Sequence, residues 1–282
     1  MSNVNGILLF IIFLTFFILL VLIYKILKNI LIINMEIPRV IHQIWIGKDI
    51  PPIVKLYMST FKKQKGFEYK LWSNKDLTKD NFPITYKYIV KILSKKKIIY
   101  AMVADLMRLE ILYHHGGIYI DATMERVKSL DKILKTKSPF IMSNEEPCGL
   151  KCRGEYNKLF ISNSFIASIP GYKVLKRLLS DEYLKSIDFN LPANLATGPY
   201  YVRRGIKRHT DVKMLPTKYI YPFPFSEEEN YDTCVSLEKK EGFRKVKYNN
   251  DKSYYIKFPC TCYKDDNVYI IKHWSVGGTW LK

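Results

Sequence analysis

The pattern of apolar positions is clearest from Ala101 to Glu125, where a helical period gives way to a strand period. Its first part predicts a helix with a broad buried face, formed by Leu106, Leu109, Ile111 and Leu112. Gly116 and Gly117 follow, and glycine allows the positive φ with which a helix can end without a clash from a Cβ atom. We therefore expect a helix that ends at this glycine pair.

The residues after the glycines, Ile-Tyr-Ile-Asp, alternate as a strand does, so Tyr119 and Asp121 are expected on the face opposite the two isoleucines. In the preceding helix, Asp105 and Arg108 are three residues apart and share one face. The charged pair and the acid at the strand end are therefore predicted to converge where open α/β sheets bind ligands. The alternative for Asp105 and Arg108 is a simple intrahelical salt bridge, worth about 0.2–0.5 kcal/mol.

Strand and helix patterns alternate along most of the chain, which predicts an α/β fold. Further strands are expected at residues 37–47, 67–72, 139–143 and 268–272, and further helices at 52–65, 86–97, 129–137 and 200–207. Residues 144–157 are expected to form a mobile loop over the site, and 216–229 a surface segment. Residues 230–266 show no pattern from which elements can be predicted.

The segment from Gly6 to Tyr24 is uncharged and almost wholly apolar, close to the roughly 20 residues that a membrane-spanning helix needs. A cleaved signal peptide is the alternative, but a basic n-region and a small-residue cleavage site are both missing. We therefore expect a single-pass membrane anchor and linker at residues 1–35 and one domain at 36–282. Basic residues follow the segment and none precedes it, which favours a cytosolic domain.

The formal net charge of +19 admits three kinds of partner: nucleic acid, an anionic membrane surface or a phosphorylated small substrate. The lysines are dispersed along the whole chain, and no signature of a nucleic-acid-binding module accompanies them. We therefore expect no nucleic-acid partner. The charge is interpreted as a lysine-rich solvated surface whose field would still attract a nucleotide diphosphate.

The five cysteines are Cys148, Cys152, Cys234, Cys260 and Cys262. They form no pair of CxxC knuckles and have no histidine at matching spacing, so a zinc cluster is a weak hypothesis. We interpret them as buried or loop thiols and leave their disulfide pairing open.

The stretch ADLMRLEILYHHGGIYIDAT, residues 104–123, resembles the signature of glycosyltransferase family 32, a sugar-binding region with a DXD motif, and of its capsular-polysaccharide-synthesis relatives. IPRVIHQIW, residues 37–45, is similar to that family's opening strand. The chain departs from the pattern after Asp121, because Thr123 stands where the second acid is expected. The resemblance implies a GT-A-type, Rossmann-like nucleotide-sugar-binding fold and a glycosyltransferase that retains the anomeric configuration.

The resemblance also implies a set of substrate-binding residues: Trp45, Asp105, Arg108, Tyr119, Asn163, Gly198 and Trp280. Asp105 and Arg108 would hold hydroxyl groups of the transferred sugar. Trp45 would stack on the nucleotide base, and a core tryptophan is an equally open interpretation. A turn-forming asparagine at Asn163 and a plain helix start at Gly198 are likewise open.

The cofactor implied is Mn²⁺ or Mg²⁺, which would bridge the two phosphates and neutralise the charge that develops on the leaving diphosphate. Asp121 and His273 would be its protein ligands, with Thr123 bound directly or through water. Losing the second carboxylate should loosen the metal, and basic side chains could share its role, so a metal-independent reaction stays open. No catalytic residue is identified.

We therefore predict a membrane-anchored glycosyltransferase that transfers a sugar from a UDP- or GDP-sugar to a glycan, glycoprotein or glycolipid acceptor. Two alternatives stay open: a protein of the same fold that binds sugar or nucleotide without catalysis, and a basic membrane-associated protein that binds polyanions. The side of the membrane on which the domain lies is also open. The charges favour the cytosol, whereas Golgi-type relatives have their domain in the lumen.

Overall fold

The computed structural model describes residues 13–25, 36–145, 160–206, 211–222, 235–236, 243–248, 252–257 and 267–273. The chain divides into two compact units, Met1–Glu36 and Ile37–Lys282. In the first unit, residues 13–25 form a helix whose large apolar side chains are exposed. Within the described ranges, no helix combines the length and the apolarity that a membrane span requires. Part of the predicted anchor, residues 6–12, lies outside these ranges.

The second unit is built on a six-stranded mixed sheet with the strand order β2-β1-β3-β6-β5-β7. Its strands are β1 (Val40–Ile44), β2 (Glu68–Trp72), β3 (Gly117–Ile120), β5 (Phe140–Glu145), β6 (Phe160–Ser168) and β7 (Val212–Leu215). β1 runs parallel to both β2 and β3, whereas β6 runs antiparallel to β3 and β5. The carboxyl ends of β1, β2, β3 and β5 therefore lie at one edge of the sheet, together with the start of β6.

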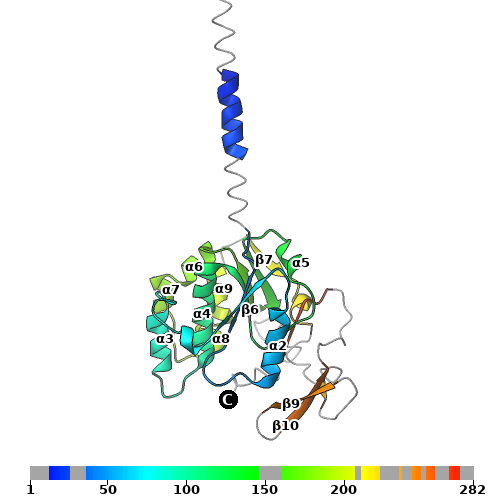
Figure 1. Cartoon of the computed structure of the whole chain (residues 1–282). Coiled ribbons are helices and arrows are strands. Elements are labelled where there is room, and N and C mark those ends of the chain that lie inside the picture. The colour runs from blue at the N-terminus through cyan, green and yellow to red at the C-terminus, as the bar shows by residue number, and fades with distance from the viewer. Residues whose placement is uncertain are drawn as a thin grey trace, which may run out of the picture. The chain divides into compact units, whose positions relative to one another are not determined.

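Helices cover both faces of this sheet (Figure 1). They are α2 (Pro52–Lys62), α3 (Tyr86–Leu93), α4 (Tyr100–His115), α5 (Asp131–Leu134), α6 (Lys173–Leu178), α7 (Asp181–Lys185), α8 (Ala193–Ala196) and α9 (Pro199–Ile206). The short 3-10 helices η1 and η2 span Asn74–Asp76 and Thr217–Tyr219. Helices α3, α4, α6, α8 and α9 gather on one side of the sheet, and α2 lies on the other (Figure 1). The α/β architecture predicted from the sequence is confirmed.

Two smaller sheets complete the described structure. β4 (Met124–Arg126) pairs antiparallel with β11 (Ile270–Lys272), and β8 (Val235–Ser236), β10 (Lys252–Lys257) and β9 (Phe243–Tyr248) form a three-stranded antiparallel sheet. β4 and β8 to β10 were not predicted, and β8 to β10 fall in the segment without a readable pattern. β11 matters most for the site, because it pairs with β4 and places Lys272 beside Asp121, the residue after β3.

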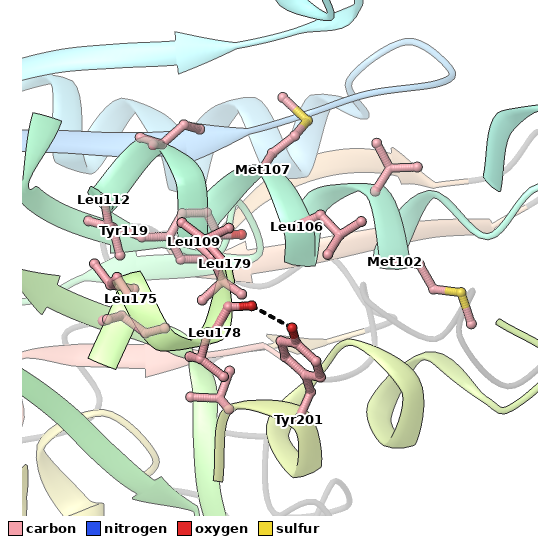
Figure 2. Close-up of a cluster of buried hydrophobic side chains, with 14 of the residues drawn as sticks. Met102, Leu106, Met107, Leu109, Leu112, Tyr119, Leu175, Leu178, Leu179 and Tyr201 are labelled. Carbon is pink, nitrogen blue, oxygen red and sulfur yellow. Dashed lines mark hydrogen bonds between the residues drawn. The ribbon is translucent and has the colours of Figure 1, made fainter. Parts of the chain in front are cut away.

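The core divides according to the two faces of the sheet, since successive side chains of a strand point to opposite faces. Tyr119 belongs to the cluster on the α4 side, whereas Ile118 and Ile120 belong to the cluster on the opposite side. Figure 2 shows the α4 side, where leucines and methionines of α4 pack against Leu175, Leu178 and Leu179, and the Tyr201 hydroxyl donates a hydrogen bond to the Leu178 carbonyl oxygen. The four residues of the predicted apolar face of α4 are at most 2% exposed.

Gly116 and Gly117 end α4 as predicted, with φ angles of 62° and 89°. A Cβ atom on Gly116 would lie 2.7 Å from the Cδ of Pro170, and one on Gly117 would lie 2.6 Å from the carbonyl oxygen of Val40. Both contacts are far below the normal separation, so both positions require glycine on steric and conformational grounds. The predicted change from helix to strand at this pair is confirmed, because β3 begins at Gly117.

Several predicted boundaries shift. The helix expected at 86–97 ends at Leu93, and the one expected at 129–137 contracts to α5. The structure adds α7, α8 and β7, which were not predicted. The predicted mobile loop lies outside the described residues except for Asn144 and Glu145, which end β5, and all five cysteines lie outside them.

Candidate active site

The site is centred on an ion pair inside α4. Asp105 and Arg108 are only 3% and 2% exposed, and Arg108 Nη2 lies 2.9 Å from Asp105 Oδ1. Two further donors reach the same carboxylate: Asn163 Nδ2 on β6 donates to Oδ1 at 2.9 Å, and Thr197 Oγ1, after α8, donates to Oδ2 at 2.8 Å. Burial raises the pKa of Asp105, and the guanidinium of Arg108 opposes that shift.

Arg108 connects this pair to the neighbouring strands. Its Nη1 donates to the carbonyl oxygen of Asn163 at 2.5 Å and lies 3.5 Å from Asp121 Oδ1. Its Cζ stands 4.4 Å from the ring centroid of Tyr119, close enough for a cation–π interaction. One guanidinium group thus contacts residues of α4, β3 and β6 as well as Asp121, the residue after β3. The predicted convergence of Asp105, Arg108 and Asp121 is therefore confirmed.

Asp121 follows directly after β3, and its side chain is 14% exposed. The Tyr119 hydroxyl donates to Asp121 Oδ1 at 2.8 Å, and Lys272 Nζ donates to Oδ2 at 2.8 Å. Although burial raises the pKa of Asp121, the charges of Lys272 and Arg108 outweigh it and hold that pKa below its ordinary value. Asp121 is therefore ionised at neutral pH, between two cations.

Lys272 is the principal site residue that the sequence did not reveal. Its Nζ donates to Thr123 Oγ1 at 2.8 Å as well as to Asp121, so one ammonium group bridges both ends of the Asp-Ala-Thr motif. His273, the next residue, instead pairs its Nε2 with Glu125 Oε2 at 3.0 Å and stacks on Tyr57 at a centroid distance of 4.0 Å. Neighbouring residues at a strand end point to opposite sides, which accounts for the two directions.

This geometry bears on the metal ion that the sequence implies. Of its three predicted ligands, Asp121 and Thr123 are both hydrogen bonded to Lys272, and His273 is paired with Glu125. A divalent ion between Asp121 and Thr123 would have to displace an ammonium group. Among the described residues, no cluster of three histidine, cysteine or acidic side chains could hold a metal ion. The side chains, as arranged, do not fit the predicted metal site.

A third carboxyl group lies at the same edge of the sheet. Glu145 ends β5, and burial raises its pKa to about 7, with Lys272 lowering and Asp121 raising it. Glu145 was not singled out in the sequence, because nothing local distinguishes it from a surface acid. Thr197 was also missed, although it lies in the Thr-Gly-Pro turn that drew attention to Gly198.

Trp45 follows β1 and therefore stands at the same edge as Asp121, which follows β3. The Nε2 of Gln43 on β1 donates to the backbone carbonyl of Asp121 at 3.3 Å, which ties the two strand ends together. Trp45 is partly buried, donates from Nε1 to the carbonyl oxygen of Lys48 at 2.8 Å, and packs against a cluster that includes Ile53. Its role in stacking on a base stays a prediction.

Gly198 and Trp280 differ from the other predicted contacts. A Cβ atom on Gly198 would lie 2.9 Å from the Cα of Asn194, and its backbone N–H donates to the carbonyl oxygen of Ala193 at 2.8 Å. The glycine thus permits the tight connection between α8 and α9. Trp280 lies outside the described residues.

Comparison with known proteins gives one family match. The family model described as capsular polysaccharide synthesis protein matches residues 27–185. Those residues include Asp105, Arg108, Asp121 and Asn163, whereas Lys272 lies beyond them.

Two relatives illustrate the range of similar proteins. "Uncharacterized glycosyltransferase L373" of Acanthamoeba polyphaga mimivirus is 29% identical over 212 residues, 71% of this chain and 79% of that protein. "Inositol phosphoceramide mannosyltransferase 1" of Schizosaccharomyces pombe is 28% identical over 151 residues, 50% of this chain and 41% of that protein. The chain thus spans less than half of the fission-yeast enzyme. Among solved structures, the PaToxG glycosyltransferase matches with a TM-score of 0.46 and 19% identity over 66% of this chain and 77% of that one.

Proposed function

The chain belongs to the capsular polysaccharide synthesis protein family and is a glycosyltransferase, and we propose that it transfers a sugar from a nucleotide-diphosphate sugar to a glycolipid acceptor. The observation that carries the proposal is the buried ion pair of Asp105 and Arg108, connected to the partly exposed Asp121 at the carboxyl edge of β3. Open α/β sheets bind nucleotides at this edge. We also propose that the fold is of the GT-A type.

The burial of these charges supports a site rather than a stabilising ion pair. Removing two charges from water costs several kcal/mol, and a buried pair is often no better for stability than apolar residues of the same volume. Here the pair carries additional partners in Asn163 and Thr197, and Arg108 Nη1 also lies 3.5 Å from Asp121 Oδ1. Such an arrangement holds one carboxylate in a fixed place, as ligand recognition requires.

The exposed fraction of each side chain indicates its role in the site. The Asp121 side chain is 14% exposed and Thr123 is also partly exposed, so these two would face the donor. Asp105 and Arg108 are almost fully buried, so we assign them the task of positioning Asp121 and Asn163. This differs from the direct sugar contacts that the resemblance implied. Trp45, at the end of the adjacent strand, would stack on the base.

The reaction follows from the chemistry of the donor. The bond between the sugar C1 and the diphosphate oxygen breaks with its electron pair on that oxygen, and the acceptor hydroxyl forms the new bond to C1. We propose that the acceptor hydroxyl attacks C1 from the face that the diphosphate leaves and gives its proton to that diphosphate, so that the anomeric configuration is retained. Comparing the anomeric protons of donor and product by NMR tests this stereochemistry directly.

The nature of the acceptor is suggested by charge and by relatives. Inositol phosphoceramide mannosyltransferases of fission yeast are similar to this chain, and their names indicate a phosphorylated lipid acceptor. The net charge of +19 favours an acceptor or surface that carries phosphate. We therefore propose a glycolipid with an anionic headgroup as the acceptor.

We also propose attachment to a membrane through Gly6 to Tyr24. In the described part of this segment, Phe13 is 68% exposed and Tyr24 65%, and the residues between them are largely exposed apolar side chains. An exposed apolar helix favours an apolar surrounding over water. If the proposal is right, the full chain will sediment with membranes after a high-salt wash, and deletion of residues 6–24 will release it.

The experiment that tests the transferase is nucleotide release by the full chain from a panel of UDP- and GDP-sugars, with a glycolipid acceptor present. Asp121→Asn should lower the rate with the preferred donor about 100-fold, because it removes the carboxylate that accepts hydrogen bonds from Tyr119 and Lys272 and fixes their positions. Asp181→Asn is the matched control, since Asp181 is 67% exposed and paired with Lys87. Nucleotide binding without release would instead favour the non-catalytic alternative. Salt-sensitive polyanion binding with no nucleotide affinity would favour the other one.

A further inference from the structure

The end of β11 places a lysine ammonium group where the sequence led us to expect a metal ion. Lys272 is 7% exposed, and its Nζ lies 2.8 Å from both Asp121 Oδ2 and Thr123 Oγ1. Those are the two side chains at the acidic positions of the DXD-like motif. The third predicted ligand, His273, pairs with Glu125 instead.

Thr123 at the second acidic position of the motif and Lys272 beside it are consistent with each other. Two carboxylates at positions 121 and 123 would together bind a divalent cation well, because oxygen anions are the ligands that Mg²⁺ and Mn²⁺ prefer. With threonine at position 123, only one of the two motif carboxylates remains, and the ammonium group of Lys272 pairs with it. The hydroxyl of Thr123 accepts a hydrogen bond from the same ammonium group without adding negative charge.

The surrounding groups hold the ammonium group where it is. Lys272 pairs with Met124 across the two-stranded sheet of β4 and β11, so its backbone is fixed immediately beside the Asp121–Thr123 turn. That turn is itself fixed, because the backbone N–H of Asp121 donates to the carbonyl oxygen of Ser164 on β6 at 2.9 Å. The position of the cation is therefore set by the fold before any substrate binds.

Building on the proposed transferase function, we propose that Lys272 is the resident cation of the active site and that sugar transfer proceeds without a divalent metal ion. The ammonium group would face the diphosphate of the donor beside Asp121. As the bond between C1 and the diphosphate oxygen breaks, the electron pair remains on the diphosphate, and Lys272 stabilises the added negative charge. The acceptor oxygen forms the bond to C1, and its proton passes to the departing diphosphate. No oxidant, reductant or other reactant is needed.

The test uses the full chain, the preferred sugar nucleotide, the glycolipid acceptor and EDTA. The unmodified protein should keep its rate of nucleotide release in EDTA to within about twofold. Lys272→Met should lower kcat about 100-fold under the same conditions, and Lys272→Arg should retain more activity because it keeps the charge. Lys87→Met is the control, since Lys87 is 61% exposed and outside the site. Thermal unfolding of each variant identifies any loss caused by misfolding.

The effect of EDTA is measured on the unmodified protein. It therefore tests the metal-independent reaction even if Lys272→Met does not fold. Activity that EDTA abolishes and Mn²⁺ restores would overturn this inference and leave the transferase function intact. Full activity of a folded Lys272→Met protein in EDTA would overturn it as well. If the unmodified protein releases nucleotide from no donor, with or without Mn²⁺, the proposed function itself fails and this inference fails with it.

Discussion

Arg108 and Asp105 lie one helical turn apart in α4, and their buried side chains meet at 2.9 Å. A surface pair at the same spacing would contribute a few tenths of a kcal/mol, but this pair has been removed from water. Its importance for stability therefore lies in the cost of breaking it. A variant that removes Arg108 and leaves Asp105 buried measures this cost.

Arg108→Leu is expected to lower the free energy of unfolding by about 3–5 kcal/mol, because it leaves the Asp105 carboxylate buried without its counterion. The double variant Asp105→Asn with Arg108→Leu should recover part of that loss, since no unpaired charge remains between them. Urea denaturation measures both. Lys87→Leu removes one partner of an exposed pair and should leave the free energy of unfolding nearly unchanged. An Arg108→Leu protein as stable as the Lys87→Leu protein would contradict this account.

Trp45 offers a test of nucleotide recognition that does not depend on turnover. If its ring stacks on the base, Trp45→Ala should weaken binding of the preferred nucleotide by about 1–3 kcal/mol, and Trp45→Phe should weaken it less. Equilibrium titration with UDP and GDP gives the dissociation constants. Unchanged affinity in a folded Trp45→Ala protein would assign this residue to the packing around Ile53 instead.

His42 makes stability depend on pH on the acid side. Burial is the main reason that its pKa falls to about 4, and its neutral ring accepts a hydrogen bond from Trp72 Nε1 at 3.2 Å. Between about pH 6.5 and pH 4, the unfolded chain binds a proton that the folded chain does not, so stability is lost as the pH falls through this range. His42→Gln should remove this contribution of the histidine to the pH dependence of stability, measured as the urea midpoint against pH. A slope identical to that of the unmodified protein would contradict it.

Glu145 makes stability depend on pH in the direction opposite to His42. Its pKa is raised to about 7, mainly by burial, so between about pH 4.5 and pH 7 the folded chain holds a proton that the unfolded chain has released. Stability from this group is complete below about pH 4.5 and is lost as the pH rises through 7. Between pH 5 and pH 8, the free energy of unfolding of Glu145→Gln should therefore fall less with rising pH than that of the unmodified protein. An unchanged slope in urea titrations over that range would contradict the raised pKa.

These two dependences overlap between about pH 4.5 and 6.5, where they have opposite signs. In the unmodified protein they largely cancel. Each single variant should therefore reveal the dependence of the residue that remains. His42→Gln should lose stability with rising pH, and Glu145→Gln should lose it with falling pH.

Local patterns in the sequence were enough to predict the centre of the fold. The helix through Asp105 and Arg108, the glycine pair and the strand before Asp121 depend on interactions between near neighbours in the chain, and all three are confirmed. The partners that complete the site are different. Lys272 lies 151 residues from Asp121, and Thr197 lies 92 residues from Asp105, so only the folded topology brings each pair together.

One signal in the sequence could have pointed to Lys272. In a strand that ends with Lys272 and His273, alternation directs the two side chains to opposite sides, so only one of them can reach Asp121. The histidine was chosen because of the family resemblance. Glu145 and the sheet of β8, β9 and β10 carried no such signal, because their roles depend on packing between distant segments.

The central claim is that this chain transfers a sugar, and mass spectrometry of the acceptor tests it most directly. The full chain would be incubated with the donor chosen by nucleotide release and a glycolipid that carries an anionic headgroup. We predict an acceptor whose mass has increased by one sugar residue, and about 100-fold less of it with Asp121→Asn. Nucleotide that binds and remains intact, with every acceptor unchanged, would contradict the claim and identify a protein that binds the donor without using it.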